Sequence, residues 1–456
     1  MLFALKVFCR HYSNIDRQPP SKKLSDEKTV FFFDLCLFRI EKKAVLEKEW
    51  IKEKLKSEVL FYCPFYKIEA SNFGKGHGSV KKAAGVKQMD YRILTINPGS
   101  TSTKVGCFEG EKEIFTVNVS HDAEKLKEFS TISSQLPYRK ETILAALKDA
   151  DVDLSTIDAF VGRGGGLLAV EGGTYKVGPV LLDHAERGAN GVQHPAQLGS
   201  QIANEFAQQY GKPCFVVNPP DTDELTLCAR MTGIKGVYRN VHLHALNLKE
   251  TAIRHSQMNG WKYEDKNYIV CHIGGGISIS AHQKGRMIDG NDIVGGEGPM
   301  APTRCGAVPA AEMIRYCFAN EDRKAVSALC TKTGGFVSHL GTSDALEVTR
   351  RAAEGDKKAA LIWDTMIYQI IRYIGAMAGV LHGEVDGILL GGGMVHNKDL
   401  VARITDSCSW IAPVSAYPGE FELEAMAAGA IRVLKGEETA KEYTGKPRWT
   451  PDEIEG

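Results

Sequence analysis

The sequence predicts an α/β protein with two similar domains that face each other across a cleft. One reason is that short apolar segments, typical of buried strands, alternate with longer segments of helical periodicity. The second reason is an internal repeat, in which each copy is a strand, a Gly/Ser loop and a returning hairpin. Two such copies place two loops on opposite sides of one cleft, where a ligand is expected to bind.

The elements follow in order along the chain. Short apolar runs bounded by Gly, Asn or Pro predict buried strands at 93–96, 159–162, 215–218, 268–273 and 387–391. Apolar residues that recur every three or four positions predict helices at 194–210, 241–258, 359–381 and 421–434. We expect a first domain at 89–240, a second at 241–420 and a C-terminal tail at 435–456; the helix at 421–434 is a candidate to pack back on the first domain.

The repeat aligns residues 93–114 with residues 269–288 at an offset of 176 positions. With this offset Gly99 matches Gly275 and Ser102 matches Ser278. We therefore expect the two loops to occupy equivalent places in the two domains.

The composition is that of a globular protein, since 43% of the 456 residues are apolar and 25% are charged. The formal net charge of zero hides an asymmetry: residues 1–88 hold 18 Lys and Arg against 10 Asp and Glu, and the remainder holds 38 against 46. Nucleic-acid binding requires a basic surface, so we expect no nucleic-acid partner for the acidic main part.

The 11 cysteines are scattered, without a C-x-x-C pair or a compact Cys/His cluster, which favours reduced thiols in the cytoplasm and gives no zinc site. The longest apolar stretch, 359–382, is interrupted by Asp364, Gln369 and Arg372, so we expect no membrane-spanning helix and no membrane partner. Residues 1–88 are an N-terminal extension of doubtful status. An upstream stretch translated from a start codon placed too early is the simplest interpretation, and a targeting or regulatory appendage is the alternative.

Three glycine loops are candidates for phosphate binding. In residues 97–104 a glycine permits close backbone approach, while amides, hydroxyls and Lys104 can contact phosphate oxygens. The second loop is 274–276, and the third, 391–393, precedes a helix. A tight hairpin turn is the alternative for the first loop. The spacing of neither a P-loop nor a dinucleotide-binding loop is present, so these loops belong to another scheme.

Seven ordered motifs across 89–434 resemble the acetate and butyrate kinase family. They are NPGSTSTK, GRGG with EGGTY, HLHALN, HIGGGISI, PTRCGAVP, GILLGGG and YPGEFELEAMAAGAIRVL, and their wording is nearest to the butyrate kinases. The resemblance implies two duplicated ribonuclease-H-like domains of the actin-like ATPase fold. It also implies reversible phosphoryl transfer between ATP and a short-chain carboxylate with Mg²⁺. Acetate or propionate as the substrate is one alternative, and an ATP-driven conformational protein of the actin or chaperone type is another.

The chemistry explains which residues the resemblance assigns. A carboxylate is already ionised near neutral pH and needs no general base, whereas alignment and compensation of negative charge are required. By similarity, Arg163, His244 and Arg304 are the catalytic candidates, with structural ion pairs as the alternative for the arginines. His242 is expected to be a core histidine instead.

The nucleotide and metal candidates also follow from the resemblance. The nucleotide set comprises Ser100, Ser102, Lys104, His272, Gly274, Gly275, Gly276, Gly391, Gly392 and Gly393. The residues expected to hold Mg²⁺ or its waters are Asn97, Glu420, Glu422, Asn218 and Asp223. A solvated helix start is the alternative for Glu422. The resemblance implies Asp at position 218, where this chain has Asn218. Compensation of the lost charge by Asp223 or Asp221 is one interpretation, and a nucleotide binder with lower metal affinity and little turnover is the alternative.

The apolar wall for the acid and the assembly are the least constrained features. Candidate wall residues flank the two arginine motifs: Val192, Pro195, Ala307, Val308 and Pro309. One methylene changes binding by only about 1–3 kcal/mol, so the sequence separates butyrate from its neighbours poorly. A homodimer or larger homo-oligomer is implied by the family alone.

Overall fold

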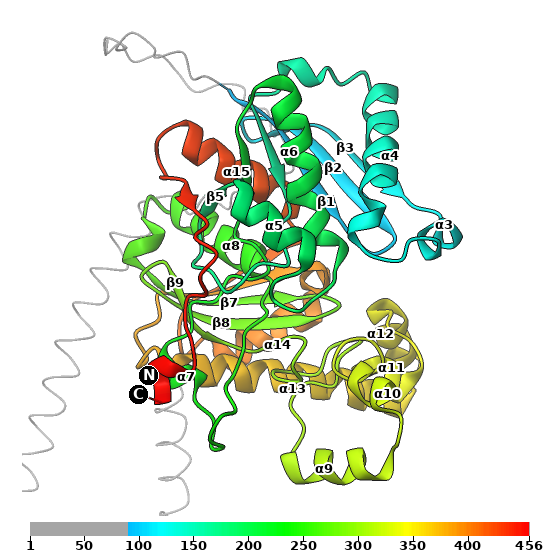
Figure 1. Ribbon diagram of the computed structural model, residues 1–456. Helices are drawn as coiled ribbons and strands as arrows, with labels where there is room; N and C mark the ends of the chain where they lie inside the picture. Colours follow the sequence, from blue (N-terminus) through cyan, green and yellow to red (C-terminus); the bar gives the residue numbers. More distant parts are fainter. Residues whose placement is uncertain (1–89, 456) are drawn as a thin grey trace, which may run out of the picture. The chain divides into compact units, whose positions relative to one another are not determined.

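The computed structural model describes residues 90–455, which form two β-sheets covered by helices (Figure 1). The predictions for the N-terminal extension 1–88 lie outside the described residues. Among the described helices, none combines the length and the apolar character needed to cross a bilayer.

The first sheet has seven strands in the order β12-β5-β6-β4-β1-β2-β3. β1 pairs antiparallel with β2, and β2 with β3, whereas β4 runs parallel to β1 and β6 runs parallel to β4. The strands are β1 (Arg92–Pro98), β2 (Ser102–Glu109), β3 (Lys112–Ser120), β4 (Ala159–Gly162), β5 (Thr174–Lys176), β6 (Cys214–Val217) and β12 (Lys441–Glu442).

The second sheet repeats this arrangement in five strands, ordered β11-β10-β7-β8-β9. β7, β8 and β9 are antiparallel neighbours, and β10 and β11 continue the sheet in parallel. The strands are β7 (Asn267–Ile273), β8 (Ile277–Gln283), β9 (Arg286–Gly290), β10 (Gly387–Gly392) and β11 (Val414–Pro418). The matching strand order confirms the predicted duplicated α/β fold.

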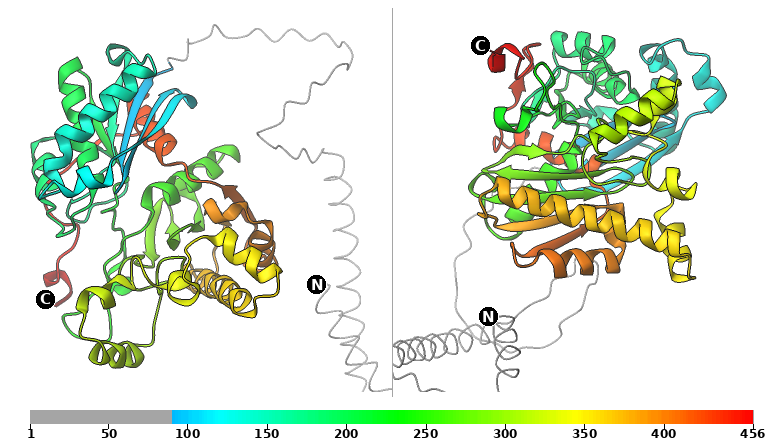
Figure 2. Two further views of the ribbon diagram at one scale, coloured as in Figure 1. Left: turned by 90° about the vertical axis from the view of Figure 1, so that its right-hand side faces the viewer. Right: turned by 90° about the horizontal axis from the view of Figure 1, so that it is seen from below.

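Helices cover corresponding faces of the two sheets. α4 (Leu136–Asp149) and α6 (Leu198–Tyr210) pack on one face of the first sheet, and α15 (Glu422–Leu434) packs on the other. In the second domain α13 (Lys357–Val380) and α14 (Lys398–Cys408) take the place of α4 and α6, as Figure 2 shows for α13 along its sheet. α8 (Ala245–Met258) covers the opposite face.

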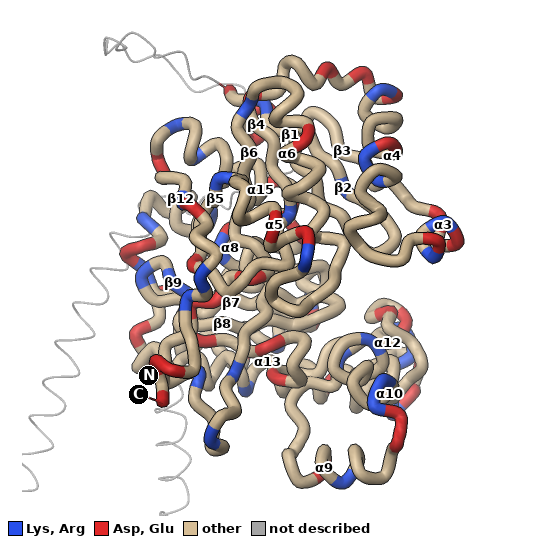
Figure 3. The backbone as a smooth tube through the Cα atoms, viewed as in Figure 1, with Lys and Arg blue, Asp and Glu red and all other residues tan. Residues whose placement is uncertain are grey.

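The remaining helices lie in connections or, for α16, at the C-terminal end of the described chain. They are α3 (Ala123–Lys127), α5 (Pro179–Arg187), α7 (Leu227–Arg230), α9 (Ala310–Ala319), α10 (Arg323–Ala328), α11 (Gly335–Leu340), α12 (Ala345–Ala353) and α16 (Asp452–Glu455). α9 to α12 lie between β9 and α13, which gives the second domain a long insertion. Acidic and basic residues are interspersed over the described chain (Figure 3).

The repeat has a different register from the predicted one. Leu94 of β1 packs towards α4 and α6, as Ile269 of β7 packs towards α13, whereas Ile93 packs towards α15. The equivalent positions in β1 and β7 are therefore 175 residues apart, and the predicted offset of 176 was wrong by one. A shift of one residue exchanges the two faces of a strand, so the correction changes which side chains are equivalent.

The corrected register pairs the two loop tips. Asn97 lies opposite Lys104 across β1 and β2, and His272 lies opposite Ser278 across β7 and β8. Asn97 therefore corresponds to His272, and Lys104 to Ser278. The offset falls to 174 in β8 because the second loop is one residue shorter than the first.

Candidate active site

A cavity of about 450 Å³ lies at the ends of the strands and is lined by both domains. The first loop and the segment after β4 contribute polar groups to it, including Asn97, Lys104 and Arg163. The second domain contributes His242, Leu243, Ile293 and Val294.

The first hairpin meets the segment that leads into α15. Asn97 Nδ2 donates a hydrogen bond to Glu422 Oε2 at 2.7 Å. Lys104 Nζ lies 3.9 Å from Glu420 Oε2. Burial, and then the neighbouring Glu422 charge, raise the pKa of Glu420. Two carboxylates predicted to hold metal are thus brought to the first loop, together with the oxygen of the Asn97 amide.

Two histidines stack beside the second hairpin. The rings of His244 and His272 are 3.9 Å apart between centroids, and His244 Nδ1 lies 2.8 Å from Ser278 Oγ. Burial lowers the pKa of His272 to about 4, and it holds the pKa of His244 well below the usual value. Both rings are therefore neutral at pH 7, and His272 Nδ1 is buried with no hydrogen-bond partner in the described part of the chain.

Arg304 lies directly over the second loop. Its Nη1 occupies the space of a Cβ at Gly276, only 1.3 Å from where that atom would be, so this contact requires glycine. The Nε and Nη1 atoms are buried without hydrogen-bond partners in the part of the chain that the structure describes. A cation with unused donors is suited to bind an anion beside the second loop.

Arg163 directly follows β4 and lines the cavity. It is buried, and its Nη1 donates to the carbonyl oxygen of Asn218 at 3.1 Å. Burial lowers its pKa, while the nearby charges of Glu422 and Asp221 act in the other direction. Burial is the main cause of the lowered His244 pKa, and the charges of Arg304 and Arg163 lower it further.

The glycines of the three loops differ in what they contact. A Cβ at Gly275 or Gly393 would enter open space, whereas one at Gly274 would come within 3.1 Å of His272 Nε2. Gly391 and Gly392 lie within β10, and a Cβ at Gly392 would come within 2.5 Å of the Ile273 carbonyl oxygen. Strand packing therefore requires glycine at position 392, and a nucleotide contact at Gly391, Gly392 or Gly393 stays a prediction.

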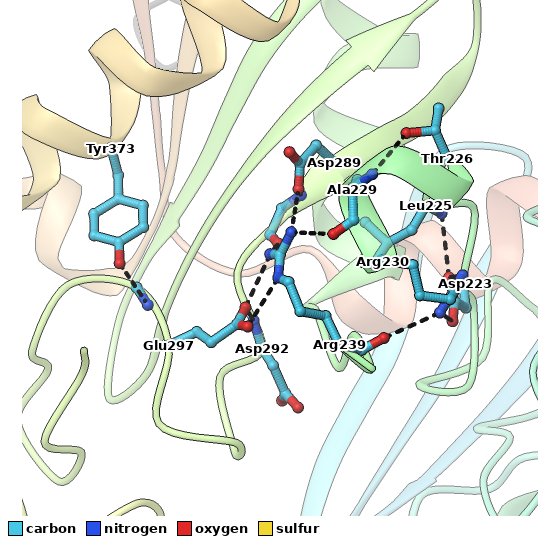
Figure 4. Close-up of polar contacts among 12 residues, drawn as sticks. Asp223, Leu225, Thr226, Ala229, Arg230, Arg239, Asp289, Asp292, Glu297 and Tyr373 are labelled. Carbon is cyan, nitrogen blue, oxygen red and sulfur yellow. Dashed lines mark hydrogen bonds and ion pairs between the residues drawn. The ribbon is translucent and has the colours of Figure 1, made fainter. Parts of the chain in front are cut away.

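Two predicted metal ligands lie outside the cavity. The Oδ1 atom of Asn218 accepts a hydrogen bond from Gly173 N at 2.7 Å, and its positive φ of 37° places it in a turn. Asp223 accepts from both terminal nitrogens of Arg230 at 2.8 and 2.7 Å, and both residues are buried (Figure 4). The side chains of Asn218 and Asp223 are thus engaged elsewhere, which corrects the metal assignment from sequence.

Asp221 lies in the cavity wall between these two residues. Its Oδ1 accepts from Asn190 Nδ2 at 2.6 Å, while its Oδ2 is buried without a partner among residues 90–455. Burial raises the pKa of Asp221 to about 6. Of the two aspartates weighed as substitutes for the missing charge at 218, only Asp221 reaches the site.

Several residues of the cavity wall were not predicted from the sequence. His242 is a wall residue and not a core histidine, with Nδ1 3.2 Å from Asp292 Oδ1. Its pKa is raised by that hydrogen bond. His194 and Asn190 also line the cavity, although no motif marked them.

The apolar wall differs in part from the predicted one. Val192 lines the cavity, and Ala196, Leu243, Ile293 and Val294 take the place of the other predicted residues. Pro195, Ala307, Val308 and Pro309 do not line it. The segment with Ile293 and Val294 is held by Arg239, which bonds Glu297 at 2.8 Å and Asp289 at 3.1 Å (Figure 4).

The donor chemistry fits Mg²⁺, a cation that takes oxygen ligands and keeps several waters when it binds phosphates. Glu420, Glu422, Asp221 and the Asn97 oxygen are hard oxygen donors near the first loop. Within residues 90–455 no group of three or more His, Cys, Asp or Glu is arranged as a ready-made metal cage.

Comparisons with known proteins agree with this geometry. The profile of the acetokinase family matches residues 234–409. The chain is 45% identical over 354 residues to butyrate kinase 1 of Clostridium acetobutylicum, an alignment that covers 77% of this chain and 99% of the relative. It is 44% identical over 358 residues to a probable butyrate kinase of Clostridium botulinum, covering 78% and 100%. The crystal structure of Porphyromonas gingivalis acetate kinase matches with a TM-score of 0.62 at 20% identity, covering 75% and 100%, and supports the fold.

Proposed function

Because the chain belongs to the acetate and butyrate kinase family, and is thus a phosphotransferase with a carboxyl group as acceptor, we propose that its preferred acceptor is butyrate. The reaction converts ATP and butyrate into ADP and butyryl phosphate. The relatives at 45% and 44% identity support this choice, since both carry the name butyrate kinase.

The cavity wall is the structural observation that carries the proposal. Val192, Leu243, Ile293 and Val294 surround the space in front of Arg163 with aliphatic groups. Burial of each further methylene of the acid contributes about 0.8 kcal/mol, so an aliphatic wall favours a four-carbon acid over acetate.

Arg163 and Arg304 divide the charge between the two reactants. Arg163 binds the acid's carboxylate at the end of β4, and Arg304 binds the transferring phosphoryl group with its free nitrogens. The neutral His244 ring donates a hydrogen bond to a phosphoryl oxygen. The ionised acid attacks the γ-phosphorus in line, without a general base, because the arginines reduce the repulsion between two anions.

The nucleotide phosphates lie between the two loops in this arrangement. Ser100, Ser102 and Lys104 contact them from the first domain, and His272 with Gly274, Gly275 and Gly276 contacts them from the second. Mg²⁺ neutralises charge on the phosphate oxygens when bound. Asn97, Glu420, Glu422 and Asp221 hold the ion or its waters.

We also place the protein in the cytoplasm as a homo-oligomer. The eight cysteines in the described part of the chain are free thiols, as expected in a reducing compartment. Large apolar side chains are exposed on the second domain, including Phe318 and Trp410, and self-association would cover them. Mass photometry of the purified protein checks the assembly, and a purely monomeric result would contradict it.

A hydroxamate assay for acyl phosphate tests the function. We expect carboxylate-dependent product with ATP and Mg²⁺, and a kcat/KM for butyrate above those for acetate and propionate. A higher kcat/KM for acetate or propionate would show that this acid, and not butyrate, is the preferred acceptor. ATP hydrolysis that is independent of every carboxylate would reject the kinase and favour an ATP-driven conformational protein.

A further inference from the structure

Arg139 of α4 is fully buried directly behind the first loop. Its Nη1 donates to Gly99 O at 2.9 Å, and its Nη2 donates to Ser100 O at 3.0 Å. Weaker contacts of Nη1 reach Ser102 O at 3.4 Å and Thr103 Oγ1 at 3.2 Å. One guanidinium group therefore contacts nearly the whole loop from inside the domain.

The loop acceptors all point inward as a result. Thr101 is the loop residue whose carbonyl does not contact Arg139, and that carbonyl accepts from His121 N at 2.9 Å. The amides of Ser100 and Thr101 donate no hydrogen bond to any residue in the described range. Because the carbonyl oxygens of the loop point into the domain, the amides of Ser100 and Thr101 point outward. Successive outward amides in a turn form a concave site for anions.

Within residues 90–455 no carboxylate pairs with the charge on Arg139. Its Nε donates to the Gln135 side-chain oxygen at 3.0 Å, so its acceptors in the described chain are all neutral. Burial lowers the pKa to about 10, which still leaves the group protonated at pH 7. Arg230, the other arginine among the largest fully buried side chains, is instead neutralised by Asp223. The unbalanced charge behind the loop favours an anion in front of it.

We propose that Arg139 is a positioning residue, which orients the first loop so that its amides bind the terminal phosphates of the nucleotide. It acts through the backbone of residues 99–102 and touches no substrate. This inference rests on the proposed function, because it assumes that the nucleotide phosphates lie against this loop.

Steady-state kinetics of the full-length Arg139→Met and Arg139→Lys proteins test the proposal. Misplacement of the loop raises KM for ATP about tenfold or more in Arg139→Met, while KM for butyrate stays within about twofold. Arg139→Lys keeps the positive charge and can donate in one of the original directions. Its KM for ATP is therefore expected to lie between the values for the unaltered protein and for Arg139→Met. An unchanged KM for ATP in folded Arg139→Met, or an equal rise for both substrates, would overturn the proposal.

Arg230→Lys is the matched control, since it alters an equally buried arginine that bonds Asp223 and lies away from the loop. We expect Arg230→Lys to lower the unfolding temperature without changing KM for ATP. If it instead raised KM for ATP as much as Arg139→Met does, the rise would be a general effect of core damage, and the proposal would be rejected. If Arg139→Met does not fold, Gln135→Leu replaces it. That variant keeps the arginine but removes the Nε acceptor, and an unchanged KM for ATP in it would then count against the proposal.

Hydrogen exchange separates this inference from the proposed function. In the unaltered protein MgADP is expected to slow exchange of the amides in residues 99–102, and this protection is expected to shrink in Arg139→Lys. Protection without any carboxylate-dependent phosphoryl transfer would remove the proposed function but keep the inference. Transfer with equal protection in both proteins would keep the function and remove the inference.

Discussion

The two hairpin loops occupy equivalent places in the duplicated domains, but each has an arginine on a different side. Arg139 lies behind the first loop and uses its donors on protein carbonyls. Arg304 lies over the second loop, where Nε and Nη1 have no partner in the described chain. The two domains therefore supply two similar turns. The position of the arginine beside each turn decides whether the backbone amides of the loop or the guanidinium group of the arginine faces the ligand.

The largest expected effect comes from displacing Arg304 without changing it. In Gly276→Ala the new Cβ would lie 1.3 Å from Arg304 Nη1, so the guanidinium must move. Loss of one preorganised donor of this kind reduces kcat about 100-fold to 1,000-fold. Initial rates of acyl phosphate formation measure the effect.

Gly375→Ala is the control for this substitution, because Gly375 lies in α13 and a Cβ there meets nothing within 4 Å. Its kcat is expected to stay unchanged, and its stability is expected to rise by about 0.5–1 kcal/mol. A Gly276→Ala protein with normal kcat would show that the position of Arg304 over the loop has no part in catalysis.

The first loop is probed by removing the charge at its tip. Lys104 lies 3.9 Å from Glu420 and corresponds to Ser278 in the second domain. Lys104→Met is expected to raise KM for ATP about tenfold, equivalent to about 1.4 kcal/mol, with a smaller change in kcat. Lys112→Met, at the exposed start of β3, is the control. If both variants behave alike, Lys104 contributes only to the overall charge.

The sequence predicts the duplicated fold well because hydrophobic periodicity and the repeat both depend on local patterns. The predicted register is wrong by one residue because the repeat was aligned on the Gly and Ser residues of two loops that differ in length by one. An alignment on the residues that face the same helices gives the correct offset. The start of α6 at Leu198, four residues later than predicted, has a similar local cause: His194 first caps a short 3₁₀ turn, Pro195–Gln197.

The site is predicted less completely than the fold. Motifs marked Arg163, His244 and Arg304, which lie in connections next to strands and helices rather than inside them, and the charges of both arginines act on His244. The choice between Asp221 and Asp223 depends on which carboxylate meets Arg230, a contact that spacing in the sequence does not encode. The partner of His242, Asp292, lies 50 residues away and is equally hidden.

The neutral histidines beside the second loop make folding stability depend on pH. The pKa of His272 is lowered from 6.5 to about 4, mainly by burial. Between these values the unfolded chain binds a proton that the folded chain does not, so stability falls as the pH decreases from about 6.5 to about 4. Chemical denaturation at several pH values should show a shallower loss in His272→Gln. Identical slopes in both proteins would mean that the buried ring does not resist protonation.

The smallest effect is expected at Asn218, a position where the resemblance implied an aspartate. A carboxylate there can still accept the hydrogen bond from Gly173 N, and the residue's link to Arg163 is through its backbone carbonyl, which the substitution retains. Because the side chain lies outside the cavity lining, Asn218→Asp should change kcat and the Mg²⁺ dependence of the rate by less than about twofold. Asp221→Asn is the informative partner, since its unpaired Oδ2 lies in the cavity wall, and we expect it to raise the Mg²⁺ concentration needed for half-maximal rate. A rate increase of tenfold or more in Asn218→Asp would instead return the metal role to position 218, because only a carboxylate that reaches the phosphates could produce it.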